Sequence, residues 1–119
     1  SRIWQIVNGD MHEFDIHPRD LGIPTAKIDD LIGGTPDENA ETLRRTLAGE
    51  QGPVRDIVLL NAAAGIVAYR LSQDPAQADR NMIQRLVEAR DRAAAAVDDG
   101  RATGKLESWI TASTSAGAA

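Results

Sequence analysis

The segment RDIVLLNAAAGIVAY, residues 55–69, is apolar over most of its length, with Asn61 as its only strongly polar side chain after Asp56. Gly52 and Pro53 precede it, and proline favours the first turn of a helix, so we predict a helix from Pro53 to about Leu71. It is short for a membrane span, which needs about 20 apolar residues. A helix that is apolar on every side is buried on every side. The segment therefore predicts a core helix that is covered all round.

Two residues of this helix carry further expectations. A buried asparagine must find hydrogen-bond partners, and we interpret Asn61 as a structural tie to a neighbouring loop or strand rather than a functional group. Glycine destabilises a helix interior relative to alanine, so Gly65 predicts close packing against another backbone.

Length and composition limit what the chain can be. The 119 residues suit one domain, and the net charge of −5 argues against a general nucleic-acid or anionic-membrane binder. The absence of cysteine excludes disulfides and thiolate metal sites. No secretory signal peptide opens the chain and no membrane-length apolar stretch occurs, so we expect a cytoplasmic location. Nineteen alanines and only four aromatic residues predict a helix-rich chain with a thin core, which is marginal without further surface to pack against.

The first strands are predicted by the sequence RIWQIVNGDMHEFDI, residues 2–16. Asn8-Gly9 supplies the two positive-φ residues of a type I′ turn, which predicts a β-hairpin. A two-residue loop pairs Ile6 with Met11, Trp4 with Glu13, Ile3 with Phe14 and Arg2 with Asp15. Both faces carry large apolar side chains, so the hairpin needs more strands or a helical cover.

Residues 17–34 contain two prolines and predict a loop with single helical turns. We expect five apolar residues to anchor this loop: Leu21, Ile23, Ile28, Leu31 and Ile32. A helix then starts at Thr35, which together with Glu38 forms a capping box around Pro36, and it ends at Gly49. Glu41 and Arg45 are spaced for an ion pair on this helix.

The C-terminal part predicts two more helices. Asp74 and Pro75 are expected to start a helix over residues 76–99, which ends at Gly100 and has Arg90 at the edge of its apolar stripe. A shorter helix over 104–112 is anchored by Leu106, Trp109 and Ile110. We therefore expect residues 1–112 to form one unit and 113–119 to be a disordered tail.

The candidates for chemistry all have simpler explanations. His12 and His17 are the only histidines and are interpreted as surface residues, because no further ligands converge on them in the sequence. Adjacent residues of a helix point about 100° apart, so neither Asp29-Asp30 nor Asp98-Asp99 is a ready-made clamp, and the helix end at Asp98-Asp99 is expected to be solvated. GGTPD, residues 33–37, resembles a phosphate-binding turn but lacks the lysine of a nucleotide loop, so we interpret it as a helix cap. We predict no catalytic, cofactor-binding or metal-binding residue in this chain.

The order of segments resembles a known family. IWQIVNG, LGIP, DDLIGG, ENAETLRRTLAGEQGPVRDIVLLNAAAGIVAY, VDDGRA and LESWI are similar to the C-terminal part of the large α/β domain of anthranilate phosphoribosyltransferase. The most specific part is the Gly-Pro-Val-Arg-Asp and Leu-Asn-Ala-Ala pattern between Gly52 and Ala63. The fold class expected from the resemblance is an α/β fragment: an N-terminal β-hairpin and three to four helices within a larger phosphoribosyltransferase domain.

The resemblance also implies an activity. Enzymes of this family transfer phosphoribosyl from phosphoribosyl pyrophosphate to anthranilate with Mg²⁺, in tryptophan biosynthesis, and work mainly as homodimers joined through N-terminal helices. Their Gly-Thr-Gly-Gly-Asp diphosphate loop and Lys-His-Gly-Asn-Arg stretch do not occur here, and their magnesium-binding Asp-Glu pair is expected before Ser1. The resemblance thus implies a C-terminal segment, truncated from a longer enzyme, that acts as scaffold, binds no magnesium and is inactive alone.

Two alternatives remain open at this stage. One is a stand-alone helical interaction module whose exposed apolar helices pair with a partner. The other is a piece of a related pyrimidine nucleoside phosphorylase, because the residues that distinguish the two enzymes lie upstream.

Overall fold

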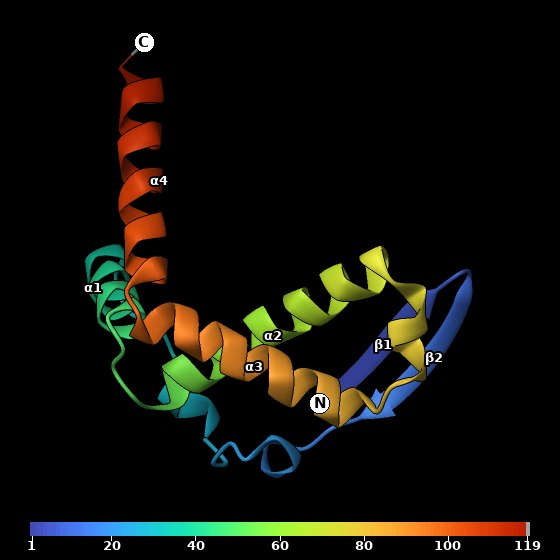
Figure 1. Ribbon diagram of the computed structural model, residues 1–119. Coiled ribbons are helices and arrows are strands. Elements are labelled where there is room, and N and C mark those ends of the chain that lie inside the picture. The colour runs from blue at the N-terminus through green and yellow to red at the C-terminus, as the bar shows by residue number, and fades with distance from the viewer. Residues whose placement is uncertain (119) are drawn as a thin grey trace.

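The computed structural model describes residues 1–118 as a β-hairpin followed by helices (Figure 1). The strands and 3₁₀ turns are β1 (Arg2–Val7), β2 (Asp10–Asp15), η1 (Pro18–Leu21), η2 (Ile28–Leu31) and η3 (Pro75–Asp79). The α-helices are α1 (Pro36–Leu47), α2 (Pro53–Gln73), α3 (Met82–Asp98) and α4 (Arg101–Gly117). The predicted hairpin followed by three to four helices is confirmed.

The hairpin has the predicted register. Asn8 and Gly9 adopt φ values of 51° and 85°, as a type I′ turn requires. Ile6 lies opposite Met11, Trp4 opposite Glu13, and Arg2 opposite Asp15. Arg2 and Asp15 form the predicted ion pair, with 3.0 Å between Nε and Oδ1. Within residues 1–118, β1 and β2 form a two-stranded sheet.

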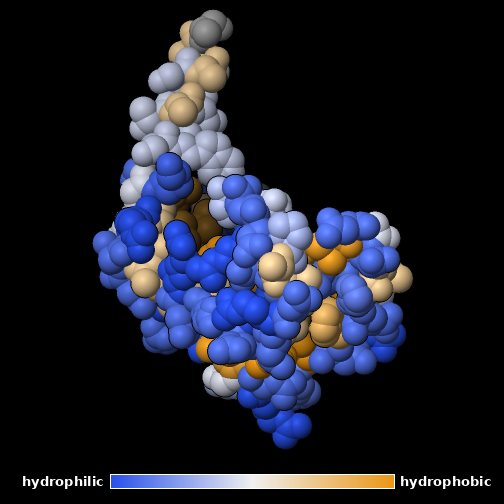
Figure 2. Space-filling model, turned by 45° about the vertical axis from the view of Figure 1, so that its right-hand side comes forward, coloured by the Kyte–Doolittle hydropathy of each residue, from blue (hydrophilic) through white to orange (hydrophobic). Residues whose placement is uncertain are grey.

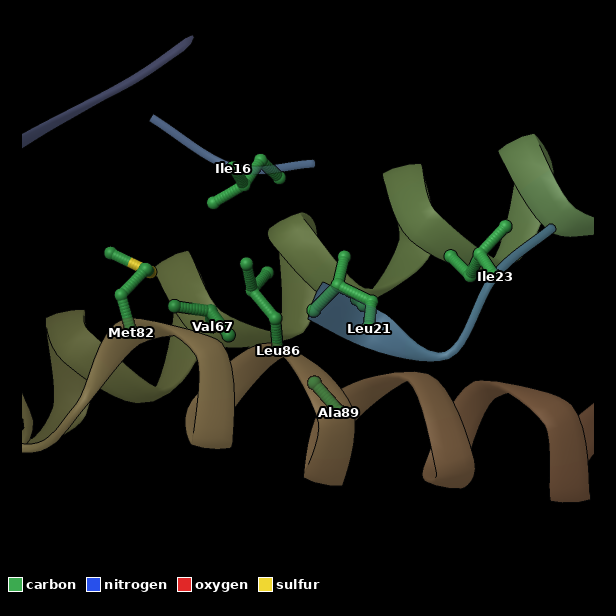
Figure 3. Close-up of a cluster of buried hydrophobic side chains, with 8 residues drawn as sticks. Ile16, Leu21, Ile23, Val67, Met82, Leu86 and Ala89 are labelled. Atoms are coloured by element: carbon green, nitrogen blue, oxygen red, sulfur yellow. The ribbon is translucent and has the colours of Figure 1, made fainter. Parts of the chain in front are cut away.

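The core lies between α2, α3 and the loop that follows the hairpin. Figure 3 shows Leu21 of this loop beside Leu86 of α3, with Ile23 farther along the cluster. The buried cluster comprises Ile16, Leu21, Ile23, Ala63, Val67, Met82, Leu86 and Ala89. A smaller cluster of Leu59, Ala93 and Val97 continues it toward the start of α2. Alanine on both helices allows their close approach, and the two helices run antiparallel.

The helix α1 forms as the capping signals predict. Pro36 occupies the first helical position and Thr35 is the N-cap. Glu41 and Arg45 form their ion pair at 2.9 Å. The chain leaves the helix through Gly49, whose φ of 104° suits glycine.

Only part of the loop anchoring is correct. Leu21 and Ile23 are buried, but Ile28 and Ile32 are 80% and 70% exposed, and Leu31 is also exposed. The prediction is wrong for these three residues because η2 lies outside the buried cluster that contains Leu21, and its approach to α2 leaves these side chains exposed.

The two C-terminal helices differ from their predicted bounds. Residues 75–79 form η3, and α3 begins only at Met82 because Asn81 acts as a new cap, its Oδ1 accepting from the Gln84 N–H at 3.1 Å. α4 is longer than predicted, 101–117 instead of 104–112, and thus includes residues 113–117 of the expected disordered tail. Ala119 lies outside the described residues. Trp109 is 71% exposed and does not anchor α4, which projects from the body (Figure 1).

The helix α2 is covered on one side only. Its buried residues recur every four positions: Arg55, Leu59, Ala63 and Val67. Ile57, Val58 and Tyr69 are exposed, so the predicted cover on every side is not supplied by residues 1–118. Gly65 is also exposed, and no atom outside the local backbone of its own helix lies within 4 Å of an added Cβ, so the predicted close packing is wrong within residues 1–118.

The chain is extended for its length. Its radius of gyration is 16.4 Å. A compact domain of this length has a radius of gyration of about 13.5 Å. The projecting α4 and the hairpin at the opposite end account for the difference (Figure 1).

Candidate functional site

Both histidines lie on the surface, as predicted. His12 is exposed on β2. His17 is exposed too and caps η1, where its Nδ1 accepts from the Arg19 N–H at 3.2 Å. Neither side chain belongs to a converging set of ligands, and His17 has a local structural role.

The GGTPD turn is a helix cap rather than a phosphate cradle. Thr35 Oγ1 accepts from the Glu38 N–H at 3.3 Å, and Glu38 Oε2 accepts from the Thr35 N–H at 2.7 Å. The hydrogen bond from the Thr35 backbone holds the pKa of Glu38 below its usual range. Gly34 N–H donates to Asn39 Oδ1 at 2.8 Å. Side chains of α1 therefore already occupy the donors that a phosphate would need.

The two carboxylate pairs are exposed, and three of the four side chains also have partners within the chain. Asp30 Oδ2 accepts from the Lys27 N–H at 2.8 Å and so caps η2. Asp98 lies 2.9 Å from a guanidinium nitrogen of Arg55. Asp99 accepts from the Arg101 N–H at 3.1 Å, and this bond lowers the pKa of its carboxyl. The end of α3 is solvated as expected, since Asp98 and Asp99 are both exposed, but the antiparallel packing also brings Arg55 to Asp98, and the sequence analysis missed this ion pair.

Asn61 is exposed, and its Nδ2 donates to the Ile57 carbonyl one turn earlier, at 2.8 Å. The predicted tie to a neighbouring loop or strand is therefore wrong within residues 1–118. The error follows from the cover expected around α2, since the side of the helix that carries Asn61 has no neighbour here.

The sequence analysis missed two buried arginines, Arg55 and Arg85, which are 6% and 3% exposed. The helical spacing of the buried residues in the sequence could have indicated both. Arg55 starts the row that continues with Leu59, and Arg85 lies between Met82 and Ala89 on the buried side of α3. Each has one fully buried guanidinium nitrogen without a hydrogen-bond partner, Nη1 in Arg55 and Nη2 in Arg85.

A groove runs between β1, the C-terminal half of α2 and the start of α3. Its volume is about 490 Å³. Most of its lining is apolar, and the polar side chains on its wall are those of Gln5, Asn8 and Ser72. No lysine, arginine or histidine of the described residues lines it, so it is not a site for a polyanion such as a diphosphate.

Metal binding and membrane insertion find no support in this part of the molecule. Among residues 1–118, no three or more His, Cys, Asp or Glu side chains come together to hold a metal ion. No helix between Ser1 and Ala118 is long and apolar enough to cross a membrane.

The comparison with protein families places the fold. The family described as "Glycosyl transferase family, a/b domain" matches residues 1–103, which is most of the chain. The chain belongs to this family.

Several relatives in this glycosyl transferase family are anthranilate phosphoribosyltransferases. The chain is 48% identical over 112 residues to that of Leifsonia xyli subsp. xyli and 52% identical to that of Clavibacter sepedonicus. It is 51% identical to that of Clavibacter michiganensis subsp. michiganensis. Each alignment covers 94% of this chain but 32% of the relative. The chain thus spans about a third of the length of these relatives, and the predicted resemblance is confirmed.

Coverage of one third bears directly on the site. Nothing observed tests the prediction that these residues contribute no catalytic, cofactor-binding or metal-binding side chain, and it stays a prediction. Three features of this glycosyl transferase segment have no partner among residues 1–118: the groove, the unpaired nitrogens of the two buried arginines and the exposed apolar surfaces.

Proposed function

We propose that this chain is the C-terminal part of the α/β domain of an anthranilate phosphoribosyltransferase, with residues 1–112 forming that portion. The carrying observation is the identity of 48–52% to three such enzymes over 94% of the chain. In this proposal the complete enzyme transfers phosphoribosyl from phosphoribosyl pyrophosphate to anthranilate, in tryptophan biosynthesis in the cytoplasm. Residues 1–119 act as scaffold.

The surface area supports a scaffold that packs against more protein. The accessible surface of the chain is 8082 Å². A folded monomer of 12.8 kDa exposes about 6,300 Å². The excess, about 1,800 Å², is roughly twice the area that one partner buries in a standard protein interface, about 800 Å². The rest of the domain is the natural occupant of this excess surface.

The exposed apolar residues show where this packing would occur. They gather on the outer face of the hairpin, on the open side of α2 and on α4: Trp4, Ile6, Met11, Ile57, Val58, Tyr69, Trp109 and Ile110. Figure 2 shows orange hydrophobic residues at the surface of the body and α4 projecting from it. Two strands alone make a marginal sheet in water, so further strands beside the hairpin would stabilise it.

In this proposal the substrates and Mg²⁺ are held by residues outside the chain, and homodimer contacts are made by helices outside it. The scaffold supports the sheet and indirectly positions the magnesium-binding loop. Catalysis needs such groups held within about 0.5 Å, which requires rigid support from the residues packed behind them.

The decisive experiment uses a chimeric enzyme. In it, the matching 112 residues of the Clavibacter sepedonicus anthranilate phosphoribosyltransferase are replaced by those of this chain. We expect anthranilate-dependent release of pyrophosphate from the chimera and none from the 119-residue chain alone. A control chimera carrying Leu86→Ala, which weakens the core, should be less stable. Release by the isolated chain, or a folded but inactive chimera, would contradict the proposal.

Exposed apolar surface also favours the interaction module as a second candidate. Sedimentation of the 119-residue chain over a concentration series separates the two. Scaffold surface predicts weak, open-ended association that grows with concentration. A single tight oligomer would favour the module.

A further inference from the structure

Arg85 is a buried cation without a carboxylate partner. Its side chain is 3% exposed, and one Nη donates to Gln5 Oε1 at 2.6 Å, while Nη2 has no partner. Gln5, on β1, is itself 6% exposed. A neutral amide therefore provides the only hydrogen bond that the described residues make to this guanidinium.

The charges around Arg85 do not compensate its positive charge. No carboxylate among residues 1–118 lies within 4 Å of Arg85, and the nearby Arg80 uses Glu88 as its own partner at 2.6 Å. Burial, and then the positive charge of Arg80, lower the pKa of Arg85. Arginine stays protonated in proteins, so the charge remains and is costly when buried without an anion.

The position of Arg85 shows from where an anion could reach it. Gln5 accepts from Arg85 and also lines the groove between β1 and α2. Met82 and Leu86, which flank Arg85 on α3, line the same groove. The guanidinium thus lies directly behind the groove wall, and a rotation of the Gln5 side chain would expose it to whatever fills the groove.

We propose that this groove receives a segment of the α/β domain outside residues 1–119, and that an Asp or Glu side chain of that segment pairs with Arg85. The inference rests on the proposed function, because the rest of the enzyme supplies the segment. The relatives are about three times as long as this chain, so such a segment is available. An apolar lining with one unpaired cation behind it suits a protein segment with a single carboxylate. A free diphosphate would need several cations.

A carboxylate can be supplied to Arg85 within the chain itself. Gln5→Glu places one where the amide now accepts the 2.6 Å hydrogen bond. We expect it to raise the thermal unfolding midpoint of the 119-residue chain by about 4 °C, because charge-assisted hydrogen bonds are stronger than neutral ones. The rise should vanish in the Arg85→Met background. A Gln5→Glu variant without an Arg85-dependent rise would overturn the inference.

The second arm compares two contexts. Arg85→Met should leave the midpoint of the 119-residue chain unchanged or raised, and lower that of the chimeric enzyme by several degrees, where the partner is present. Arg55→Met is the matched control and should lower both, because its partner Asp98 lies within the chain. Equal shifts for Arg85→Met in both contexts would contradict the inference. The isolated chain could lack a cooperative unfolding transition. In that case the chimera decides: an Arg85→Met chimera with the same unfolding midpoint as the unsubstituted chimera would contradict the inference.

The remaining arm tests other occupants. Inorganic phosphate and pyrophosphate are titrated into the wild-type chain and the Arg85→Met variant, and we expect no difference in stabilisation. Stabilisation that depends on Arg85 would assign the site to a free anion, and Arg85-dependent dimerisation would assign it to a second copy; either overturns the inference. All these experiments measure stability or mass, not activity. A chimera that is inactive but still shows the context-dependent shift in its unfolding midpoint would therefore contradict the proposed function and support the inference about Arg85.

Discussion

The two ends of the α2–α3 pair each bury an arginine, but the two arginines have different kinds of partner. At one end Arg55, at the start of α2, reaches Asp98 at the end of α3, with a nitrogen–oxygen distance of 2.9 Å. At the other end Arg85, near the start of α3, reaches only the amide of Gln5 on β1. The first end is closed by the chain's own charges. The second is open, and it is the end beside the groove. Similar burial of the same residue type therefore marks a structural tie in one place and an unfinished contact in the other.

The two ends can be compared only if α2 and α3 form one packed unit. Leu86→Ala tests this, and we expect it to lower the free energy of unfolding more than any other substitution below. Leu86 is 1% exposed and lies in the core between the two ends. Removing a buried leucine side chain costs about 2–5 kcal/mol, through lost burial and the cavity left behind. Urea unfolding followed by circular dichroism measures the change. Ile28→Ala, at a residue 80% exposed, is the control and should change little. Equal effects of the two substitutions would show that no such core exists.

The closed end is tested by Asp98→Asn. The substitution keeps the shape of the side chain but leaves Arg55 buried without an anion. Breaking a fully buried pair costs about 3–5 kcal/mol. The Asp98 side chain is 54% exposed, so we expect a smaller loss in the free energy of unfolding, about 2 kcal/mol. A change below the error of the urea measurement would mean that the two ends do not differ in the way proposed.

A surface ion pair gives a reference for the loss in unfolding free energy expected of Asp98→Asn. Glu41→Gln removes one of the two carboxylate partners of Arg45, the other being Glu50, and both Glu41 and Arg45 are about half exposed or more. Exposed pairs of this kind contribute about 0.3–0.5 kcal/mol. The same urea experiment should therefore place Glu41→Gln well below Asp98→Asn. A reversed order would show that burial of Arg55 has no energetic consequence.

Acid should weaken the closed end slightly, through Asp99. The Arg101 N–H lowers the pKa of this carboxyl in the folded chain. Because the folded pKa is below the unfolded one of about 3.9, the stabilisation is complete above that value and is lost as the pH falls through the folded pKa. The difference in thermal midpoint between the wild type and Asp99→Asn should therefore be present at pH 6 and disappear in strong acid. A difference that is independent of pH would contradict this origin.

Local signals in the sequence predicted several elements correctly. The hairpin register, the Thr35–Glu38 cap and the Glu41–Arg45 pair each depend on residues that are close in the chain, so short-range geometry decides them. The extra cap at Asn81 was also local, but it was overlooked because the apolar stripe predicted one continuous helix. The exposure of Ile28 and Asn61 was mispredicted because hydropathy reports what a residue prefers to pack against, not whether a neighbour is present.

The sequence by itself determined the turn at Asn8-Gly9, the capped start of α1 and the membership of the chain in the glycosyl transferase family. The tertiary structure alone decided the partners of Arg55 and Arg85, which lie 43 and 80 residues away in the chain. Helical periodicity can place an arginine on a buried side of its helix. Only the packing of the elements brings a carboxylate to one guanidinium and an amide to the other, because charge pairing depends on distances in space and not on spacing in sequence.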